Sequence, residues 1–152
     1  MNARSTPGSC KKFRRTPWRF QQTVALPEAS NRDQFVSTII AALDGLKSAA
    51  ITIDKVVFNT ERLRALCGSA VILGHDTTLS ANSAEAMRAL LLAAFWDGMN
   101  FICIPTPKPF VFYADHDDWI TFYANTKSYL NHVIEPLASR GYNLVQNWQR
   151  EL

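Results

Sequence analysis

The sequence predicts an α+β fold in which helices cover a mainly antiparallel sheet. Aromatic, strand-like runs at 110–114 and 119–124 flank a polar turn, which predicts a hairpin and therefore antiparallel pairing. Two other segments, 30–46 and 83–96, repeat apolar residues at helical spacing. Strands and helices do not alternate regularly, as they would around a parallel sheet. We therefore expect about three helices packed on one sheet, preceded by a disordered basic N-terminal arm.

The arm is expected to span 1–16, and a single α+β domain to span 17–152. Residues 1–23 hold six of the sixteen basic residues and no acidic ones, which leaves ten basic against thirteen acidic residues in the rest of the chain. Pro7 and Gly8 interrupt the arm, and no apolar periodicity offsets the entropy of ordering it. Because no apolar segment follows the basic residues, a cytoplasmic location is expected, with organelle import of the basic N-terminus as the alternative.

Capping residues and glycines mark the elements of the first half. Ser30 precedes one helical pattern, Ser83 precedes another, and Gly68 follows a short third one. Alternating or β-branched residues predict the strands between them. In chain order, we expect a strand at 18–23, helices at 30–46 and 61–67 around a strand at 51–58, a buried strand at 70–73 and a polar segment at 74–82.

The second half begins with the helix at 83–96, which Asp97 and Gly98 end. A short apolar strand at 101–104 then leads into alternating prolines, which favour a stiff, extended connection. After the hairpin, Asn125 or Thr126 caps a helix that ends near Gly141, and a final strand follows.

The composition is that of one domain without a membrane span. The chain has 152 residues, of which 47% are hydrophobic, and this length suits a single core. The most apolar stretch, 84–96, contains Glu85 and Arg88 and is too short to cross a bilayer. Charged residues make up 19% of the chain, less than the roughly 25% of typical domains. Some apolar surface is therefore expected to meet a partner, and a homodimer is one way to cover it.

No motif for a cofactor or a catalytic nucleophile is present. The three cysteines, Cys10, Cys67 and Cys103, form no close pair, which argues against a disulfide scaffold and a zinc site. The glycines never form the arrays that bind phosphates, and no Gly-x-Ser-x-Gly sequence occurs. We therefore predict no cofactor and no catalytic residues, and we favour a protein that is not an enzyme.

The leading hypothesis is a small protein-binding module, of the inhibitor or immunity type, that neutralises a basic partner. Its partner-binding residues would lie on the hairpin, where aromatic side chains provide anchors and carboxylates provide complementary charge. These residues are Asp115, His116, Asp117, Asp118 and Trp119. A plain polar hairpin tip is the structural alternative, because turns select Asp for its own backbone hydrogen bonds.

A second hypothesis makes the protein a nucleic-acid-associated accessory factor. Its basic arm would contact phosphates through Lys11, Lys12, Arg14, Arg15 and Arg19. The alternative is a solvated tail without a partner.

A third hypothesis is a metal-dependent enzyme. Imidazole and carboxylate groups at two places in the chain are suitable ligands for a divalent metal, provided that the fold brings them together. The residues concerned are His75, Asp76, Asp115 and His116. Their spacing matches no specific metal motif, and it is not that of the twelve-residue calcium loop.

Overall fold

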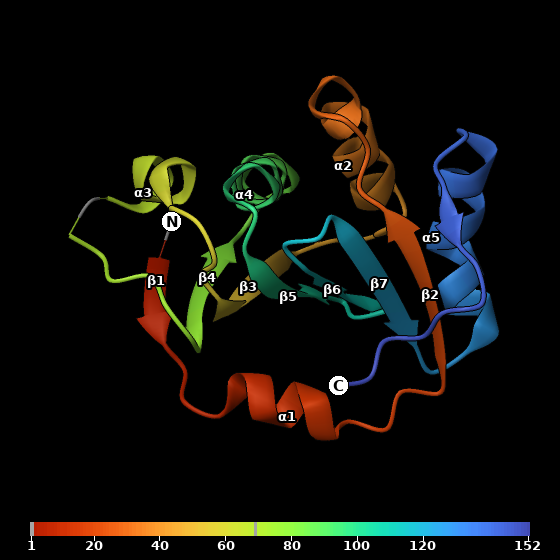
Figure 1. Ribbon diagram of the computed structural model, residues 1–152, viewed down its shortest axis with the longest axis horizontal. Coiled ribbons are helices and arrows are strands. Elements are labelled where there is room, and N and C mark those ends of the chain that lie inside the picture. Colours follow the sequence, from red (N-terminus) through yellow and green to blue (C-terminus); the bar gives the residue numbers. More distant parts are fainter. Residues whose placement is uncertain (1, 69) are drawn as a thin grey trace.

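The computed structural model describes residues 2–68 and 70–152 and has an α+β fold built on one antiparallel sheet (Figure 1). All neighbouring strands of this sheet pair in the antiparallel sense. The order across the sheet is β1 (Asn2–Ser5), β4 (Thr77–Ala81), β3 (Ser48–Lys55), β5 (Asn100–Thr106), β6 (Val111–Ala114), β7 (Trp119–Ala124), β2 (Phe20–Ala25) and β8 (Leu144–Val145). The predicted fold class and antiparallel sheet are confirmed.

Helices cover the two faces of the sheet unequally (Figure 1). One face is covered by α2 (Arg32–Ala41), α3 (Glu61–Cys67), α4 (Ala84–Asp97) and α5 (Lys127–Ser139), whereas α1 (Ser9–Arg15) lies alone across the other. The described residues thus form five α-helices, together with a 3-10 turn at Ala29–Asn31, where about three helices were expected. No helix within the described ranges is both long and apolar enough to cross a membrane.

The predicted disorder of the N-terminal arm is wrong. Residues Asn2–Ser5 form β1, which pairs with β4, and α1 packs on the sheet. The segment is ordered because two apolar side chains among its basic residues are buried. Cys10 and Phe13 pack against residues of β5, β6 and β7. Asp76 adds to this ordering, because its carboxylate accepts the backbone N–H groups of Gly8 and Cys10 at 2.8 and 2.9 Å. These contacts with distant segments offset the conformational entropy that the N-terminal segment loses when it becomes ordered.

The structure also differs from the prediction in the region between α3 and α4. A strand was expected at 70–73 and a polar segment at 74–82, but the strand is β4 (Thr77–Ala81) within the second range. Its polar appearance arises because Thr78 and Ser80 face the surface that α1 partly covers, while Leu79 and Ala81 join the main core.

The hairpin and the two long C-terminal helices are confirmed. Strands β6 and β7 pair with Val111 opposite Tyr123. The hydroxyl of Ser83 accepts the N–H of Ala86 at the start of α4, and the hydroxyl of Thr126 accepts the N–H of Tyr129 at the start of α5. The final strand is shorter than expected, since β8 covers only two residues.

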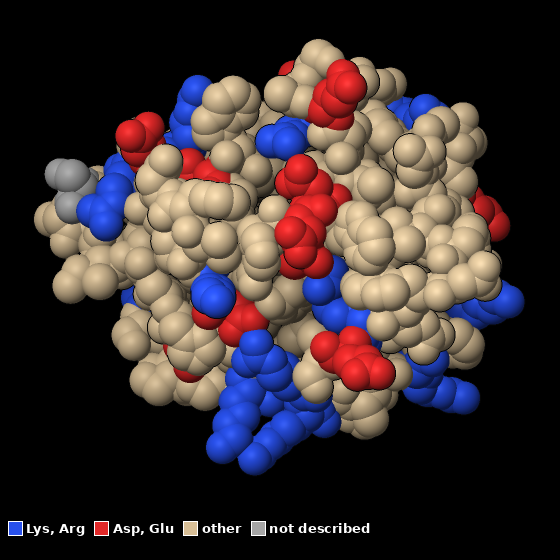
Figure 2. Space-filling view, in the orientation of Figure 1, with Lys and Arg blue, Asp and Glu red and all other residues tan. Residues whose placement is uncertain are grey.

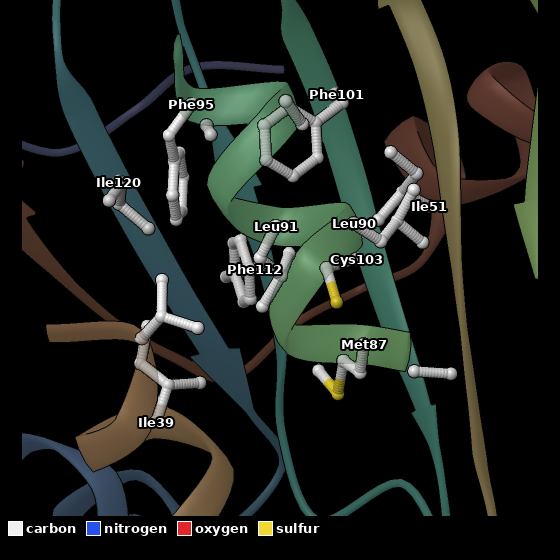
Figure 3. Packing of buried hydrophobic residues seen from close by; sticks show 14 of the residues in the cluster. Ile39, Ile51, Met87, Leu90, Leu91, Phe95, Phe101, Cys103, Phe112 and Ile120 are labelled. Atoms are coloured by element: carbon white, nitrogen blue, oxygen red, sulfur yellow. The ribbon is translucent and has the colours of Figure 1, made fainter. Parts of the chain in front are cut away.

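The main core lies between the sheet and the four helices α2, α3, α4 and α5 (Figure 3). From α4, Met87, Leu90, Leu91 and Phe95 point at the sheet, where they meet large aromatic side chains such as Phe112. A second, smaller core under α1 contains Cys10, Phe13, Ile102, Val111, Tyr113 and Tyr123, with Trp18 packed against it. The two faces of the sheet thus carry cores of very different size.

Candidate functional site

A groove of about 490 Å³ lies between α1 and the open half of the sheet face beneath it. Residues of β3, β4 and β5 form its floor, Arg4 of β1 lines it, and Lys12 of α1 and Thr16, which follows that helix, belong to its wall. Its size is that of a site for a small molecule or for a short stretch of a polymer.

The floor carries several hydroxyl groups beside apolar residues such as Ile104, because the strands alternate small hydroxyl residues with core residues. On β3, Ser48 and Thr52 face the groove while Ile51 and Ile53 are buried in the main core. The hydroxyl oxygen of Thr78 on β4 lies 2.8 Å from that of Thr52. Small side chains fill little of the space above the strands, so the hollow remains open between α1 and the sheet.

An aromatic cluster holds α1 in place and closes the other half of this face. The ring of Phe13 lies 5.6 Å from that of Tyr123 and 6.2 Å from that of Tyr113, measured between centroids. Trp18 packs at 6.0 Å from both Phe13 and Tyr123. Offset and edge-on contacts of this kind stabilise beyond the area they bury, and they confine the opening to the β3, β4 and β5 side.

The groove is positively charged. Arg4, Lys12 and Lys108 line it, and no Asp or Glu belongs to its lining among the residues that the structure describes. Lys12 also lines a shallow depression on α1, together with Lys11 and Arg15. Figure 2 shows Lys and Arg side chains gathered over α1, at the lower edge of the molecule. Ordering the N-terminal segment therefore concentrates its charge on one face.

Two of the five basic residues proposed for nucleic-acid binding have contacts within the protein: Arg14 forms an ion pair, and Arg19, which stays exposed, lies near the ring of its sequence neighbour. The guanidinium of Arg14 pairs with the buried carboxylate of Asp54, and this hydrogen bond raises the pKa of Arg14 above its usual value. The hydroxyl of Tyr113 donates to the same carboxylate at 2.5 Å. Arg19 lies 5.8 Å from the centre of the Phe20 ring. Lys11, Lys12 and Arg15 are the members of the set that stay on the groove and α1 surface.

The hairpin residues are brought together, but Asp115 is not free. Its carboxylate accepts the backbone N–H groups of Asp117 and Trp119 and forms an ion pair with Arg150 at 2.9 Å. The side chains of this pair are only 13% and 11% exposed. Trp119 packs edge-on against Trp148, with ring centres 4.5 Å apart.

The exposed part of the hairpin tip consists of two acids beside an aromatic residue. Asp117 and Asp118 are exposed, and the ring of His116, which is hydrogen-bonded to Asn100, lies 6.5 Å from that of Phe58. Phe58 is 65% exposed. The tip thus retains negative charge and one open aromatic face.

The four proposed metal ligands do not form one site among the described residues. His75 and Asp76 lie together, but the third potential ligand beside them is Cys10 of α1 rather than Asp115 or His116. Sequence spacing gave no indication of this arrangement, because 66 positions separate Cys10 from Asp76.

The sequence hypotheses also missed Arg4, Lys108 and the hydroxyl floor. The sequence feature that could have indicated this floor is the alternation of Ser48, Ala50 and Thr52 with residues of the main core. Such alternation is typical of a strand with one face of small side chains. Comparisons with known protein families, with curated proteins and with solved structures found no match for the chain.

Proposed function

We propose that the protein is a binding protein for single-stranded nucleic acid and that the strand lies in the groove beside α1. The observation that carries the proposal is the groove lining, in which Arg4, Lys12 and Lys108 occur without a carboxylate among the described residues. Phosphate groups are the common biological ligands for such a surface, and hydroxyl and backbone groups assist lysine and arginine in holding them.

The distribution of charge favours a polymer over a mononucleotide. Lys12 belongs both to the groove and to the depression that Lys11 and Arg15 line, so the positive surface continues from the groove over α1. A strand can follow such a track with several phosphates, whereas one nucleotide can contact only part of it. Trp18, which is half-buried at the groove, offers an aromatic surface for a base.

The test is a fluorescence-anisotropy titration of a labelled oligothymidylate with the protein at several salt concentrations. The affinity of the wild-type protein is expected to fall as salt rises, with a slope of about −0.7 for each phosphate contacted. Replacing Arg4, Lys12 and Lys108 together by alanine removes three such contacts, so the slope is expected to become shallower by about 2.

A matched control removes the same charge elsewhere. Lys55, Arg62 and Arg140 are exposed and lie outside the groove lining, so their triple alanine variant is expected to keep nearly the full slope. Equal losses in the two triple variants would contradict the groove as the binding site. A duplex or free thymidine monophosphate that binds as tightly as the oligonucleotide would contradict a single strand as the ligand.

The second candidate is the protein-binding module that blocks a basic partner through the hairpin. The exposed Phe58 ring beside His116 favours it, because an open aromatic residue next to Asp117 and Asp118 combines an apolar anchor with negative charge. Residues Asp115 and Trp119 would contribute by fixing the shape of the tip.

A pull-down from native lysate with nuclease treatment tests this candidate. A stoichiometric partner that survives nuclease and moderate salt is expected to be lost with Asp117→Ala plus Phe58→Ser and with Asp117→Ala plus Trp119→Ala, but retained by the groove triple variant. Retention of every partner by both hairpin variants would exclude the hairpin as the interface.

A further inference from the structure

Three side chains with metal-binding atoms meet where α1 begins. Cys10 comes from α1, whereas His75 and Asp76 come from the segment before β4. One ligand atom from each lies within 4.8 Å of the others, and within the described ranges no other group of three His, Cys, Asp or Glu side chains does so. The cluster is separate from the groove, since none of its members lines that hollow.

The histidine is oriented as a metal ligand would be. Its Nδ1 lies 2.8 Å from the backbone carbonyl oxygen of Asp54, and a carbonyl can only accept, so Nδ1 carries the hydrogen. In the neutral ring this leaves Nε2 with a free lone pair. A hydrogen bond from the second ring nitrogen to a carbonyl or carboxylate is the usual support of a metal-bound histidine.

The free lone pair of His75 faces a carboxylate rather than a donor. Its Nε2 lies 3.5 Å from Oδ2 of Asp76, and two lone-pair atoms at this distance attract each other only when a cation or a proton lies between them. Ligand atoms about 2 Å from a tetrahedral zinc ion are roughly 3.3 Å apart. The observed separation therefore needs only a small adjustment.

The carboxylate of Asp76 is held in place by the start of α1. It accepts the backbone N–H of Gly8 through Oδ2 and that of Cys10 through Oδ1, at 2.8 and 2.9 Å. Each carboxylate oxygen keeps a second lone pair after these bonds. The same contacts bring Cys10 beside the carboxylate, and its thiol donates to the backbone carbonyl oxygen of Ile53 at 3.5 Å.

The charge around the thiol favours a cation. The carboxylates of Asp54 and Asp76 lie near Cys10, and Arg14 pairs with only the first of them. His75 is 59% exposed, so an ion can reach the cluster from solvent past the imidazole.

We propose that Cys10 Sγ, His75 Nε2 and one oxygen of Asp76 bind a zinc ion that fastens α1 to the segment before β4. The mixed sulfur, nitrogen and oxygen set favours zinc over magnesium or calcium, which prefer oxygen ligands alone. Binding forms a Zn–S bond and releases the thiol proton to solvent, and a water molecule takes the fourth position.

Zinc binding by the full chain is measured by isothermal titration calorimetry and by metal analysis after dialysis. We expect one zinc ion per chain and a rise in melting temperature when zinc is added, because the ion joins segments that are distant in sequence. His75→Ala and Cys10→Ser are each expected to weaken binding at least about tenfold. His75→Ala is the safer variant for folding, because its side chain is mainly exposed.

Matched controls and a spectroscopic readout separate this site from incidental metal binding. Cys67→Ser and His116→Ala remove the same side-chain types elsewhere and are expected to leave zinc affinity unchanged. Cobalt is expected to give a thiolate charge-transfer band that Cys10→Ser abolishes and Cys67→Ser keeps. Absence of stoichiometric zinc, or equal losses in the control variants, would overturn the proposal whatever the outcome of the nucleic-acid titrations.

Discussion

The groove beside α1 and the tip of the β6–β7 hairpin both gather charged and aromatic residues, but they use them differently. At the hairpin, Asp115 is paired with Arg150 and Trp119 is packed on Trp148. At the groove, the aromatic residues hold α1, and Lys12 and Lys108 remain without a carboxylate partner in the described part of the chain. A dense charge pattern in a sequence therefore does not indicate which charges are available to a ligand.

The largest effect is expected from Arg150→Ala, which removes the partner of Asp115. Because the pair is mostly buried, the lone carboxylate that remains should cost about 4 kcal/mol in the free energy of unfolding. Urea denaturation measures the loss. The double variant Arg150→Met plus Asp115→Asn should recover part of it, since no buried charge is then left unpaired. A loss under about 1 kcal/mol would mean that the hairpin tip does not depend on this pair.

Phe13→Ala is expected to loosen the groove and leave the hairpin tip intact. The ring is 4% exposed, and its removal should destabilise the protein by about 3 kcal/mol. Since α1 carries Lys12, oligonucleotide affinity should fall as well. Urea denaturation and the anisotropy titration check the two effects. Lys11→Ala is the control on the exposed side of the same helix, and it should change affinity without a comparable change in stability.

Tyr123→Phe, a substitution in the small core under α1, is expected to stabilise the protein, whereas Phe13→Ala in the same core destabilises it. The hydroxyl of Tyr123 is buried and has no hydrogen-bond partner among the described residues, so its removal should stabilise the protein by about 1 kcal/mol. Differential scanning calorimetry measures this gain. A decrease in stability would show that the hydroxyl has a partner.

The same substitution should change the response to alkaline pH. Burial raises the pKa of Tyr123 from 10.0 to about 12. The unfolded chain therefore loses this proton first, so the stability that the protonated form provides is complete below about pH 10 and falls as the pH rises toward 12. Tyr123→Phe should make this fall less steep, and an unchanged slope would contradict the assignment.

The smallest effect is expected from Asp117→Ala at the exposed hairpin tip. The side chain is 78% exposed, and such substitutions usually change stability by less than about 0.5 kcal/mol. Oligonucleotide affinity should not decrease, because the substitution removes negative charge. A clear loss of affinity would place the hairpin in the nucleic-acid interface.

Local chemistry explains what the sequence could predict. The turn around Asp115 and the serine cap of α4 at Ser83 are stabilised by residues within a few positions, so their signals are visible in short windows. The hairpin and the C-terminal helices were therefore predictable. Lys11, Lys12 and Arg15 could be named as candidates for phosphate contacts, because a run of basic residues is visible without a fold.

The remaining features depend on contacts between distant segments. Helix α1 is ordered by Asp76 and Tyr113, which lie far from it in sequence, so its charged residues looked like a disordered arm. The groove lies over strands of which two pairs, β1 with β4 and β3 with β5, are neighbours in the sheet but not in the chain. Its cations Arg4 and Lys108 could be associated only after the strand order was known.

The most direct test of the groove is a ¹⁵N–¹H NMR titration with a short oligothymidylate, because it observes both regions at once. The amide resonances of Arg4, Lys12, Thr52, Thr78 and Lys108 are expected to shift in proportion to bound oligonucleotide, while those of Asp117 and Asp118 stay in place. Shifts confined to the hairpin, or no shifts at low salt, would contradict the groove as the binding site for a nucleic-acid strand.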